Sequence, residues 1–222
     1  SADAFAGLDP QANFKPQVNG VDTTLDKAVQ AAAKILRQSV QPLFGGLSTD
    51  VAGMRALMQL GDVCGATFDH MNSESKLRNL LVLQDSGFVN TTFAEVKNHA
   101  DLIIFFGTDA VSRFPRLFER LVWNKDSLAE LDTATREIIY LGEAKNTQAG
   151  IAPDGRKPTL IKCANDNLRE IAATLRALLG GKTLQTEQVG GIKIAVLKKL
   201  LEKIQAAKYA VFCWSAADLN FP

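Results

Sequence analysis

Paired or clustered cysteines are absent from this sequence. Its 222 residues include three cysteines, Cys64, Cys163 and Cys213, which lie far apart and form no C-x-x-C pair. The spacing therefore indicates neither a disulfide framework nor a zinc or iron–sulfur site, because these need paired thiols. We expect three buried, reduced thiols, as is usual for free cysteine.

Histidine is also scarce, and the common catalytic motifs are missing. His70 and His99 have no histidine, cysteine or carboxylate at a spacing typical of metal ligands, so we expect both to be structural. The sequence contains no G-x-G-x-x-G, Walker, G-x-S-x-G or H-E-x-x-H motif. Any catalytic function must therefore be argued from other residues.

Long apolar runs and an excess of one charge are missing as well. The longest runs, "DLIIFF" and "YAVFCW", fall far short of the roughly 20 residues that cross a bilayer. The first residues lack the basic, apolar and small-residue order of a secretory signal, so we expect a cytoplasmic protein. With 25 basic and 24 acidic residues, the net charge of +1 gives no field that would attract nucleic acid or an anionic membrane.

The sequence does contain a regular alternation of helix and strand patterns, with 46% apolar residues to form a core. The expected strands are apolar throughout, which indicates burial on both faces, as in a parallel sheet between helices. We predict an α/β fold with a doubly wound, mostly parallel, Rossmann-like sheet and helices on both faces. The expected helices are 23–38, 48–65, a segment within 69–87, 91–100, 166–179 and about 187–207, and the expected strands are 40–46, 66–70, 101–106, 137–143, 159–163 and 209–214.

The predicted organisation is an N-terminal arm, residues 1–20, followed by an α/β domain, residues 21–222. Because the chain starts with Ser1 and stops just after a buried-type strand, we expect a fragment of a longer subunit or a shortened relative. Thr23 and Asp26 are expected to cap the first helix as a capping box. Ser48, Thr49 or Asp50 is expected to cap the second.

Ligands of open parallel sheets bind beyond the carboxyl ends of the strands. Three such ends carry glycine and polar residues: 44–50, 69–75 and 106–116. Gly45 and Gly46 would let the backbone approach a ligand, beside a helix N-terminus that could bind an anion. The alternative is that they serve only a tight turn.

The third of these ends, "FGTDAVSRFPRLFER", has the richest chemistry. Pro115 suits the first turn of a helix, on which three arginines could share a face and bind phosphates or carboxylates. A solvated arginine stripe is the alternative. The arginines are Arg113, Arg116 and Arg120, and the candidate crevice residues are Gly45, Gly46, Gly107, Thr108, Asp109, Arg113 and Arg116.

Four segments carry a resemblance to a known family: "LDKAVQAAAKIL", "GATFDH", "LLVLQDSGFVNTTFAEVKNHADLIIFFGTDAVSRFPRLFER" and "WSAADLNFP". They resemble the B subunit of formylmethanofuran dehydrogenase, above all the versions in methylotrophic bacteria, which look like parts of a formyltransferase/hydrolase complex. The resemblance implies an α/β subunit related to molybdopterin oxidoreductases such as formate dehydrogenase. Redox-active members carry an iron–sulfur module, a tungsten or molybdenum pyranopterin centre, and a cysteine or selenocysteine ligand.

The sequence departs from that family pattern. No cysteine precedes Val21, and the position that matches the metal ligand is Ser75, followed by Lys76 where active members have histidine. Thr108 and Asp109 stand where relatives favour asparagine and proline. A serine hydroxyl stays protonated near neutral pH and is a poor substitute for a soft thiolate. We therefore expect no catalytic residue and no cofactor in this chain, with Ser75 needed only as a helix-start residue, as Ser73 is.

The leading hypothesis is a non-redox structural or carrier-binding subunit in tetrahydromethanopterin-linked one-carbon metabolism, from formaldehyde to formate. Its expected partners are the other subunits of a formyltransferase/hydrolase complex and a methanofuran-like carrier, but no nucleic acid and no membrane. Two alternatives remain. One is a redox-active tungsten or molybdenum formylmethanofuran dehydrogenase subunit, and the other is a nucleotide-binding α/β protein.

Overall fold

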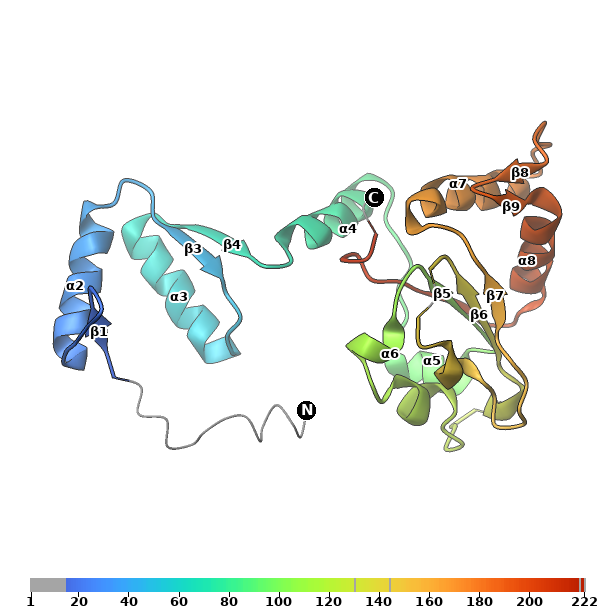
Figure 1. Ribbon diagram of the computed structural model, residues 1–222, viewed down its shortest axis with the longest axis horizontal. Coiled ribbons are helices and arrows are strands. Elements are labelled where there is room, and N and C mark those ends of the chain that lie inside the picture. Colours follow the sequence, from blue (N-terminus) through green and yellow to red (C-terminus); the bar gives the residue numbers. More distant parts are fainter. Residues whose placement is uncertain (1–14, 130, 144, 220, 222) are drawn as a thin grey trace. The chain divides into compact units, whose positions relative to one another are not determined.

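The chain forms two compact units, Ser1–Ser73 and Glu74–Pro222. The computed structural model describes residues 15–129, 131–143, 145–219 and 221 (Figure 1). Each unit is described by itself, and the assignment of residues 21–222 to one domain stays a prediction. Most of the expected arm, residues 1–14, lies outside the described residues.

The first unit is built around a two-stranded parallel sheet. A hairpin comes first, formed by the antiparallel strands β1 (Gln17–Val18) and β2 (Val21–Asp22). The parallel pair follows, with Leu43 opposite Thr67 at one end and Gly46 opposite His70 at the other. The remaining elements in chain order are α2 (Leu25–Gln38), β3 (Leu43–Gly46), α3 (Val51–Cys64) and β4 (Thr67–His70).

The two helices of this unit begin at side-chain caps. The predicted capping box with Thr23 is wrong, because the backbone amide of Thr23 donates to the carbonyl of Pro16 and holds that residue in the hairpin. Thr24 caps α2 instead, its hydroxyl accepting from the amide of Lys27 at 3.4 Å. At α3 the cap is Asp50, whose carboxylate accepts from the amide of Gly53 at 2.7 Å.

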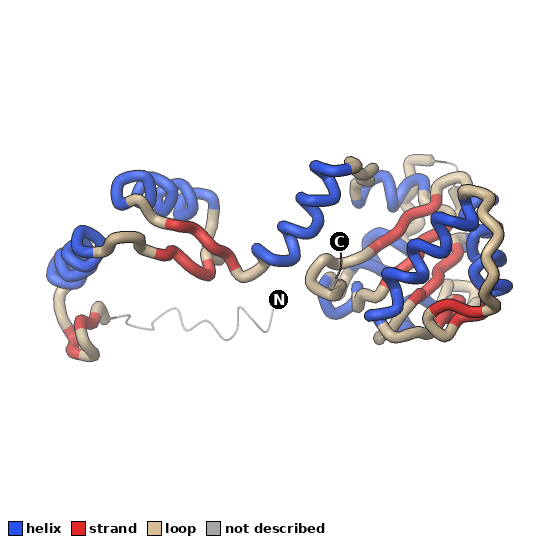
Figure 2. Tube along the Cα trace, turned by 90° about the horizontal axis from the view of Figure 1, so that it is seen from above, coloured by secondary structure: helices blue, strands red, loops and turns tan. Residues whose placement is uncertain are grey.

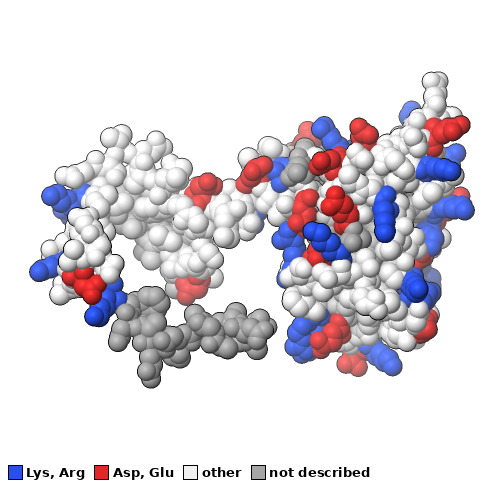
Figure 3. All heavy atoms as spheres, in the orientation of Figure 1, with Lys and Arg blue, Asp and Glu red and all other residues white. Residues whose placement is uncertain are grey.

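The apolar side chains of the first unit are largely exposed. Helix α2 has no buried residue, and α3 buries only Gly61, where a Cβ would overlap the ring of Phe68. Phe68 in turn meets Phe44 edge to face, with ring centroids 5.5 Å apart. The face of this unit in Figure 3 is mostly uncharged. Close packing is therefore confined to the contact of α3 with the strand pair.

The second unit contains a four-stranded parallel sheet in the order β10-β5-β6-β7. The chain runs outward from β5 to β7 (Figure 1) and then crosses to β10 on the other side of β5. This reversal makes a topological switch point between β5 and β10. The predicted α/β fold with a parallel sheet flanked by helices is confirmed. Its strands are β5 (Leu102–Phe106), β6 (Glu137–Leu141), β7 (Thr159–Ile161) and β10 (Ala210–Cys213).

Helices and short turns fill the connections between these strands. The prediction of one helix from about 187 to 207 is wrong at its start, because Gly190 and Gly191 adopt positive φ angles of 56° and 79° and turn a hairpin there. The helical elements are α4 (Ser73–Asp85), α5 (Phe93–His99), α6 (Ala110–Arg113), the π-helix η1 (Phe118–Val122), the 3-10 helices η2 (Thr133–Thr135), η3 (Thr147–Gly150) and η4 (Asn165–Asn167), α7 (Leu168–Leu179) and α8 (Ile194–Ala206), with the hairpin strands β8 (Gln188–Val189) and β9 (Ile192–Lys193) before α8.

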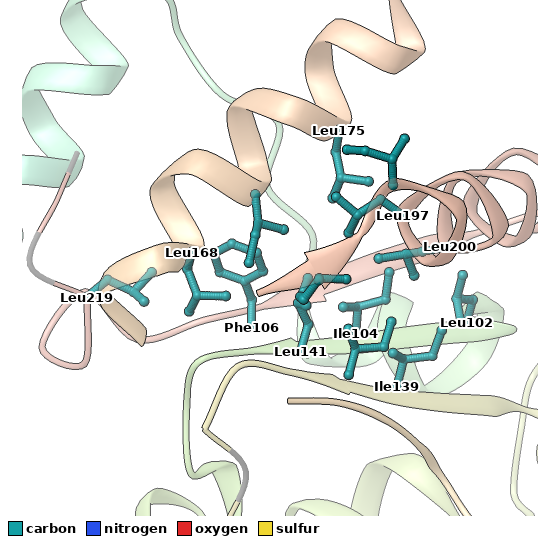
Figure 4. Packing of buried hydrophobic residues seen from close by; sticks show 14 residues of the cluster. Leu102, Ile104, Phe106, Ile139, Leu141, Leu168, Leu175, Leu197, Leu200 and Leu219 are labelled. Carbon is teal, nitrogen blue, oxygen red and sulfur yellow. The ribbon is translucent and has the colours of Figure 1, made fainter. Parts of the chain in front are cut away.

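The sheet of the second unit is buried on both faces. Every residue of β5 is buried, as expected for a central parallel strand. Leu102, Ile104 and Phe106 pack in one cluster with side chains of α7 and α8 (Figure 4). Ile103 and Phe105 pack in the opposite cluster with α5 and η1. Figure 2 shows the strands of this unit between helical layers.

Arg136 is a buried cation, 1% exposed, that precedes β6. Its guanidinium donates to main-chain carbonyls at 2.5–3.2 Å. Burial lowers the pKa of Arg136 to about 10. The side chain ties the carboxyl ends of α5 and η1 together, where free carbonyls and the helix dipole favour a cation. The accepting carbonyls belong to Val96, Lys97, Ala100, Leu121 and Val122.

Asp101 holds the start of β10 against β5. Its carboxylate accepts from the backbone amides of Lys208 and Tyr209 at 2.7 and 2.9 Å. Partial burial raises the pKa of Asp101, but these hydrogen bonds outweigh burial and hold the pKa below its ordinary value of 3.8. A carboxyl whose pKa is lowered by folding stabilises the fold above its unfolded pKa. That contribution is lost as the pH falls through the lowered folded value.

We therefore expect Asp101→Asn to lower the free energy of unfolding by about 1 kcal/mol at neutral pH. The variant should also lose less stability than the parent chain between neutral pH and about pH 3. Urea unfolding at both pH values measures the two effects. Asp166→Asn, at an exposed position, is the control and should behave as the parent chain does. An unchanged acid dependence in Asp101→Asn contradicts the assignment.

The three cysteines are free, but they are only partly buried, so the expectation of full burial is wrong. Cys64 ends α3 in the open first unit, and Cys213 lies on the edge strand β10. Burial raises the pKa of the thiols of Cys163 and Cys213. Among the described residues, no helix has the length and apolar character needed to cross a bilayer.

Candidate functional site

The candidate site lies in the second unit, beyond the carboxyl ends of β5 and β10 at the switch point. Thr108 follows β5 and is 5% exposed. Its hydroxyl donates to a carboxylate oxygen of Asp218 at 2.6 Å. Asp218 lies beyond the end of β10, in a turn closed by its amide donating to the carbonyl of Ser215 at 2.9 Å. The two neighbouring strands thus end in one hydrogen-bonded polar group.

Arg113 closes the same group from α6. Its Nε donates to Oδ2 of Asp218 at 3.1 Å, and its Nη2 pairs with Oδ1. The hydrogen bond to Asp218 raises the pKa of Arg113. Partial burial raises the pKa of Asp218, but the hydrogen bonds from Arg113 and Thr108 outweigh it and hold the pKa below its ordinary value. The pair is therefore charged at neutral pH, with bidentate geometry.

Asp109 organises the neighbouring turn. Its carboxylate accepts from the amide and the hydroxyl of Ser112 at 3.2 and 2.8 Å and from the amide group of Asn146 at 2.7 Å. Burial raises the pKa of Asp109, but the hydrogen bonds from Ser112 and Asn146 outweigh it and lower the pKa. Asp109 thus caps α6 and ties it to the loop after β6.

Gly107 lets the backbone at the end of β5 lie close to its neighbours. Its φ is +60°, and its amide donates to the carbonyl of Leu141 at 2.8 Å. The side chain of Asn165 donates to the carbonyl of Gly107 at 2.9 Å and accepts from the amide of Glu143 at 3.0 Å. Asn165 therefore bridges the ends of β5 and β6. A Cβ on Gly107 would overlap Leu168 and lie 3.0 Å from Oδ1 of Asn165.

The predicted arginine face on one helix is wrong. Helix α6 ends at Arg113, because Phe114 precedes Pro115 and takes a non-helical conformation with φ −133°. Arg116 follows in a turn, where it pairs with Glu119 at 2.6 and 3.0 Å. Arg120, in η1, also approaches Glu119, at 3.5 Å. Arg116 and Arg120 are about 60% exposed and share one acidic partner.

The charges at this edge decide which ligands fit. Asp109 and Asp218 place two ionised carboxylates beyond the strand ends, with Arg113 as the paired cation. A phosphate there would meet carboxylate repulsion, which disfavours the nucleotide alternative. Arg116 and Arg120 leave one uncompensated positive charge on the adjoining surface. Figure 3 shows mixed charges on this unit.

Metal ligands are not clustered in the described part of the chain. His99 lies one helical turn after Glu95, with Nε2 3.5 Å from Oε2, so the expectation that it has no carboxylate neighbour is wrong. That pair stands without a third ligand, since no group of three or more His, Cys, Asp or Glu side chains among the described residues could hold a metal ion.

No family model matches the sequence. Curated proteins do match it. The chain is 27% identical over 206 residues to the B subunit of tungsten-containing formylmethanofuran dehydrogenase 2 of Methanocaldococcus jannaschii, covering 89% of this chain and 44% of that protein. It is 37% identical over 139 residues to the B subunit of the formyltransferase/hydrolase complex Fhc of Methylorubrum extorquens, covering 58% of this chain and 35% of that protein.

A solved structure matches as well. It is the crystal structure of the formyltransferase/hydrolase complex FhcABCD from Methylorubrum extorquens with methylofuran. The TM-score is 0.74 at 26% identity, and the match covers 91% of this chain and 52% of the matched chain. The chain is thus similar to proteins named as B subunits of formylmethanofuran dehydrogenase and of the formyltransferase/hydrolase complex. It spans half or less of the length of the curated relatives it matches.

The structure places the predicted site residues in separate groups. Gly45 and Gly46 end β3 in the first unit, where Gly46 has φ +77°. Ser75 is half-buried in the first turn of α4, and Lys76 beside it is exposed. Ser73 begins that helix, and its hydroxyl accepts from the amide of His70 at 2.9 Å. The remaining candidates, 107–116, lie at the switch point.

Sequence reasoning missed three residues that complete the switch-point site. Asp218 could have been found, because the rule on carboxyl ends of strands applies to "YAVFCW" as it does to "DLIIFF". Asn146 and Asn165 follow β6 and β7 and bind across the edge. They had no comparable signal, since asparagine is common in loops.

Proposed function

We propose that this chain is a non-redox component of a formyltransferase/hydrolase complex, equivalent to its B subunit, with a structural or carrier-binding role. Such a complex passes a formyl group from tetrahydromethanopterin to a methanofuran-like carrier and releases formate. The other subunits would perform transfer and hydrolysis. This chain would hold them together or bind the carrier.

One observation carries the proposal: the fold agrees over 91% of the chain with a chain of the FhcABCD complex. The chain is also 37% identical over 139 residues to the B subunit of that complex, and 27% identical over 206 residues to the tungsten-containing relative of Methanocaldococcus jannaschii. The matched structure contains methylofuran. These likenesses support a role beside a methanofuran-like carrier.

The residues of the chain do not fit a tungsten centre. Ser75, which the resemblance puts at the metal-ligand position, offers a hydroxyl where tungsten needs a soft donor. The described residues offer no alternative group of three ligands. Asp109 would bring a carboxylate near the phosphates of a pterin at the end of β5.

A second candidate is a redox-active subunit, since two matched relatives are named tungsten-containing. Purification of the tagged chain from its native host, followed by mass spectrometry and metal analysis, separates the two. Co-purification of formyltransferase and hydrolase subunits without tungsten or molybdenum supports the proposal. Stoichiometric tungsten or molybdenum supports the redox candidate, and the absence of both partners and metal contradicts both.

The arginines beside the switch point offer a mutational test. Arg116→Glu is expected to weaken complex assembly or carrier binding about fivefold, because it reverses an exposed positive charge that would attract an acidic partner or carrier. Arg113 is less suitable, since its guanidinium holds Asp218 and its reversal would also disturb the fold. Affinity of the purified partner subunits or carrier, measured by calorimetry, gives the result.

Lys125→Glu is the matched control, because Lys125 is exposed shortly after η1 but lies outside the arginine group. It should leave assembly and carrier binding unchanged. Equal losses in Arg116→Glu and Lys125→Glu would indicate a general effect of charge. No loss in Arg116→Glu would remove the arginines from the proposed interface.

A further inference from the structure

The second unit contains an apolar cavity that the switch-point site does not use. It lies among α4, α7, α8 and the end of β10 and has a volume of about 540 Å³. Pockets that bind small molecules usually measure about 300–1,000 Å³ and are mostly apolar. Its wall is formed chiefly by Val82, Phe106, Leu175, Leu201, Phe212 and Trp214.

The charged residues of the cavity wall are all arginines. Arg78 comes from α4 and Arg176 from the last turn of α7, and the wall contains no aspartate, glutamate or lysine. Arg176 forms no ion pair with any described carboxylate. An apolar wall with two guanidinium groups complements a ligand with an apolar body and an anionic end.

Arg78 also has an unused donor. Its Nη1 pairs with Glu74 at 2.8 Å, and its Nη2 donates to the carbonyl of Ala216 at 2.8 Å. Its Nε is buried and has no acceptor among the described residues. This Nε has too little accessible surface to meet a ligand in the cavity, so Arg78 would act there through its charge and its Nη groups. Glu74 is almost fully exposed and screened by water, so it compensates Arg78 only weakly.

We propose that this cavity binds a small amphipathic carboxylate, such as a medium-chain fatty acid. The chain would lie among the phenylalanine, leucine and tryptophan side chains, and the carboxylate would accept from Arg78 and Arg176. The cavity has no acidic group that would favour a cation. The inference does not depend on the proposed function, because it rests on the wall of this cavity alone.

Three ligands with the same chain test the proposal: decanoate, decanol and decylammonium, each below its micelle concentration. Calorimetric titration of the full chain should give saturable decanoate binding and at least tenfold weaker decylammonium binding. Arg176→Met and Arg78→Met should each weaken decanoate about tenfold and leave decanol nearly unchanged, because only decanoate uses the guanidinium groups.

Two more variants test whether decanoate binds in this cavity or at another apolar surface of the chain. Arg169→Met changes an exposed arginine of α7 outside the cavity and should leave decanoate binding unchanged. Ala172→Phe fills the cavity and should abolish binding of decanoate and decanol alike. Equal binding of the three ligands, equal losses in Arg169→Met and Arg176→Met, or no saturable decanoate binding would each overturn the proposal.

Discussion

Replacement of Arg136 by methionine is expected to lower the free energy of unfolding of the second unit by about 3–5 kcal/mol. Methionine fills part of the volume but cannot donate, so five main-chain carbonyls lose their shared donor. These carbonyls end α5 and η1, and both helix ends lie against β5 and β6. Urea unfolding followed by circular dichroism measures the loss.

Two further variants test whether the loss in Arg136→Met comes from the hydrogen bonds of its guanidinium group. Arg136→Lys keeps the charge but not the planar guanidinium group. Its free energy of unfolding should fall by less than that of Arg136→Met, but by more than about 1 kcal/mol, the contribution of one hydrogen bond. Arg120→Met removes an exposed arginine and should change the free energy of unfolding by less than about 0.5 kcal/mol. Similar losses for Arg136→Met and Arg120→Met would contradict the structural role.

Gly107→Ala is expected to cost about 2–4 kcal/mol. The residue has φ +60°, where a Cβ is unfavourable, and that Cβ would also overlap Leu168 and crowd Asn165. Relief of the overlap must shift the end of β5, and Thr108 would then lose its alignment with Asp218. Thermal or urea unfolding gives the cost.

Gly155→Ala is the control for the backbone part of this effect. Gly155 has φ +88°, but a Cβ there would meet nothing within 4 Å. Its replacement should cost about 1 kcal/mol, the conformational share alone. If Gly107→Ala costs no more than Gly155→Ala, the steric argument for the switch-point edge fails.

The strands of the second unit were predictable because a short, continuous apolar run indicates a strand buried on both faces. Residues 102–106 and 138–141 are apolar throughout, and only a sheet covered on both faces can bury such strands. Helix starts were less predictable. The glycine pair 190–191 breaks a pattern that otherwise continues as a helix, and Pro115 separates two short helices instead of opening one.

The candidate site was predictable only on one strand. Thr108, Asp109 and Arg113 follow β5 directly and were found from the strand-end rule. Their partners Asp218, Asn146 and Asn165 come from segments far along the chain, and contacts between distant segments depend on strand order, which local patterns do not contain. The ion pairs of Arg116 and Arg120 with Glu119, in contrast, join near neighbours in the sequence.

The reversal of strand order also bears on how the second unit folds. Strand β5 pairs with β6 across a short connection, whereas its pairing with β10 joins segments separated by roughly a hundred residues. Closing so long a loop costs entropy before the contacts form, which slows folding. During synthesis, β10 leaves the ribosome after the other strands, so one edge of β5 stays unpaired until then. That interval is when the nascent chain is most exposed to aggregation through its buried strand.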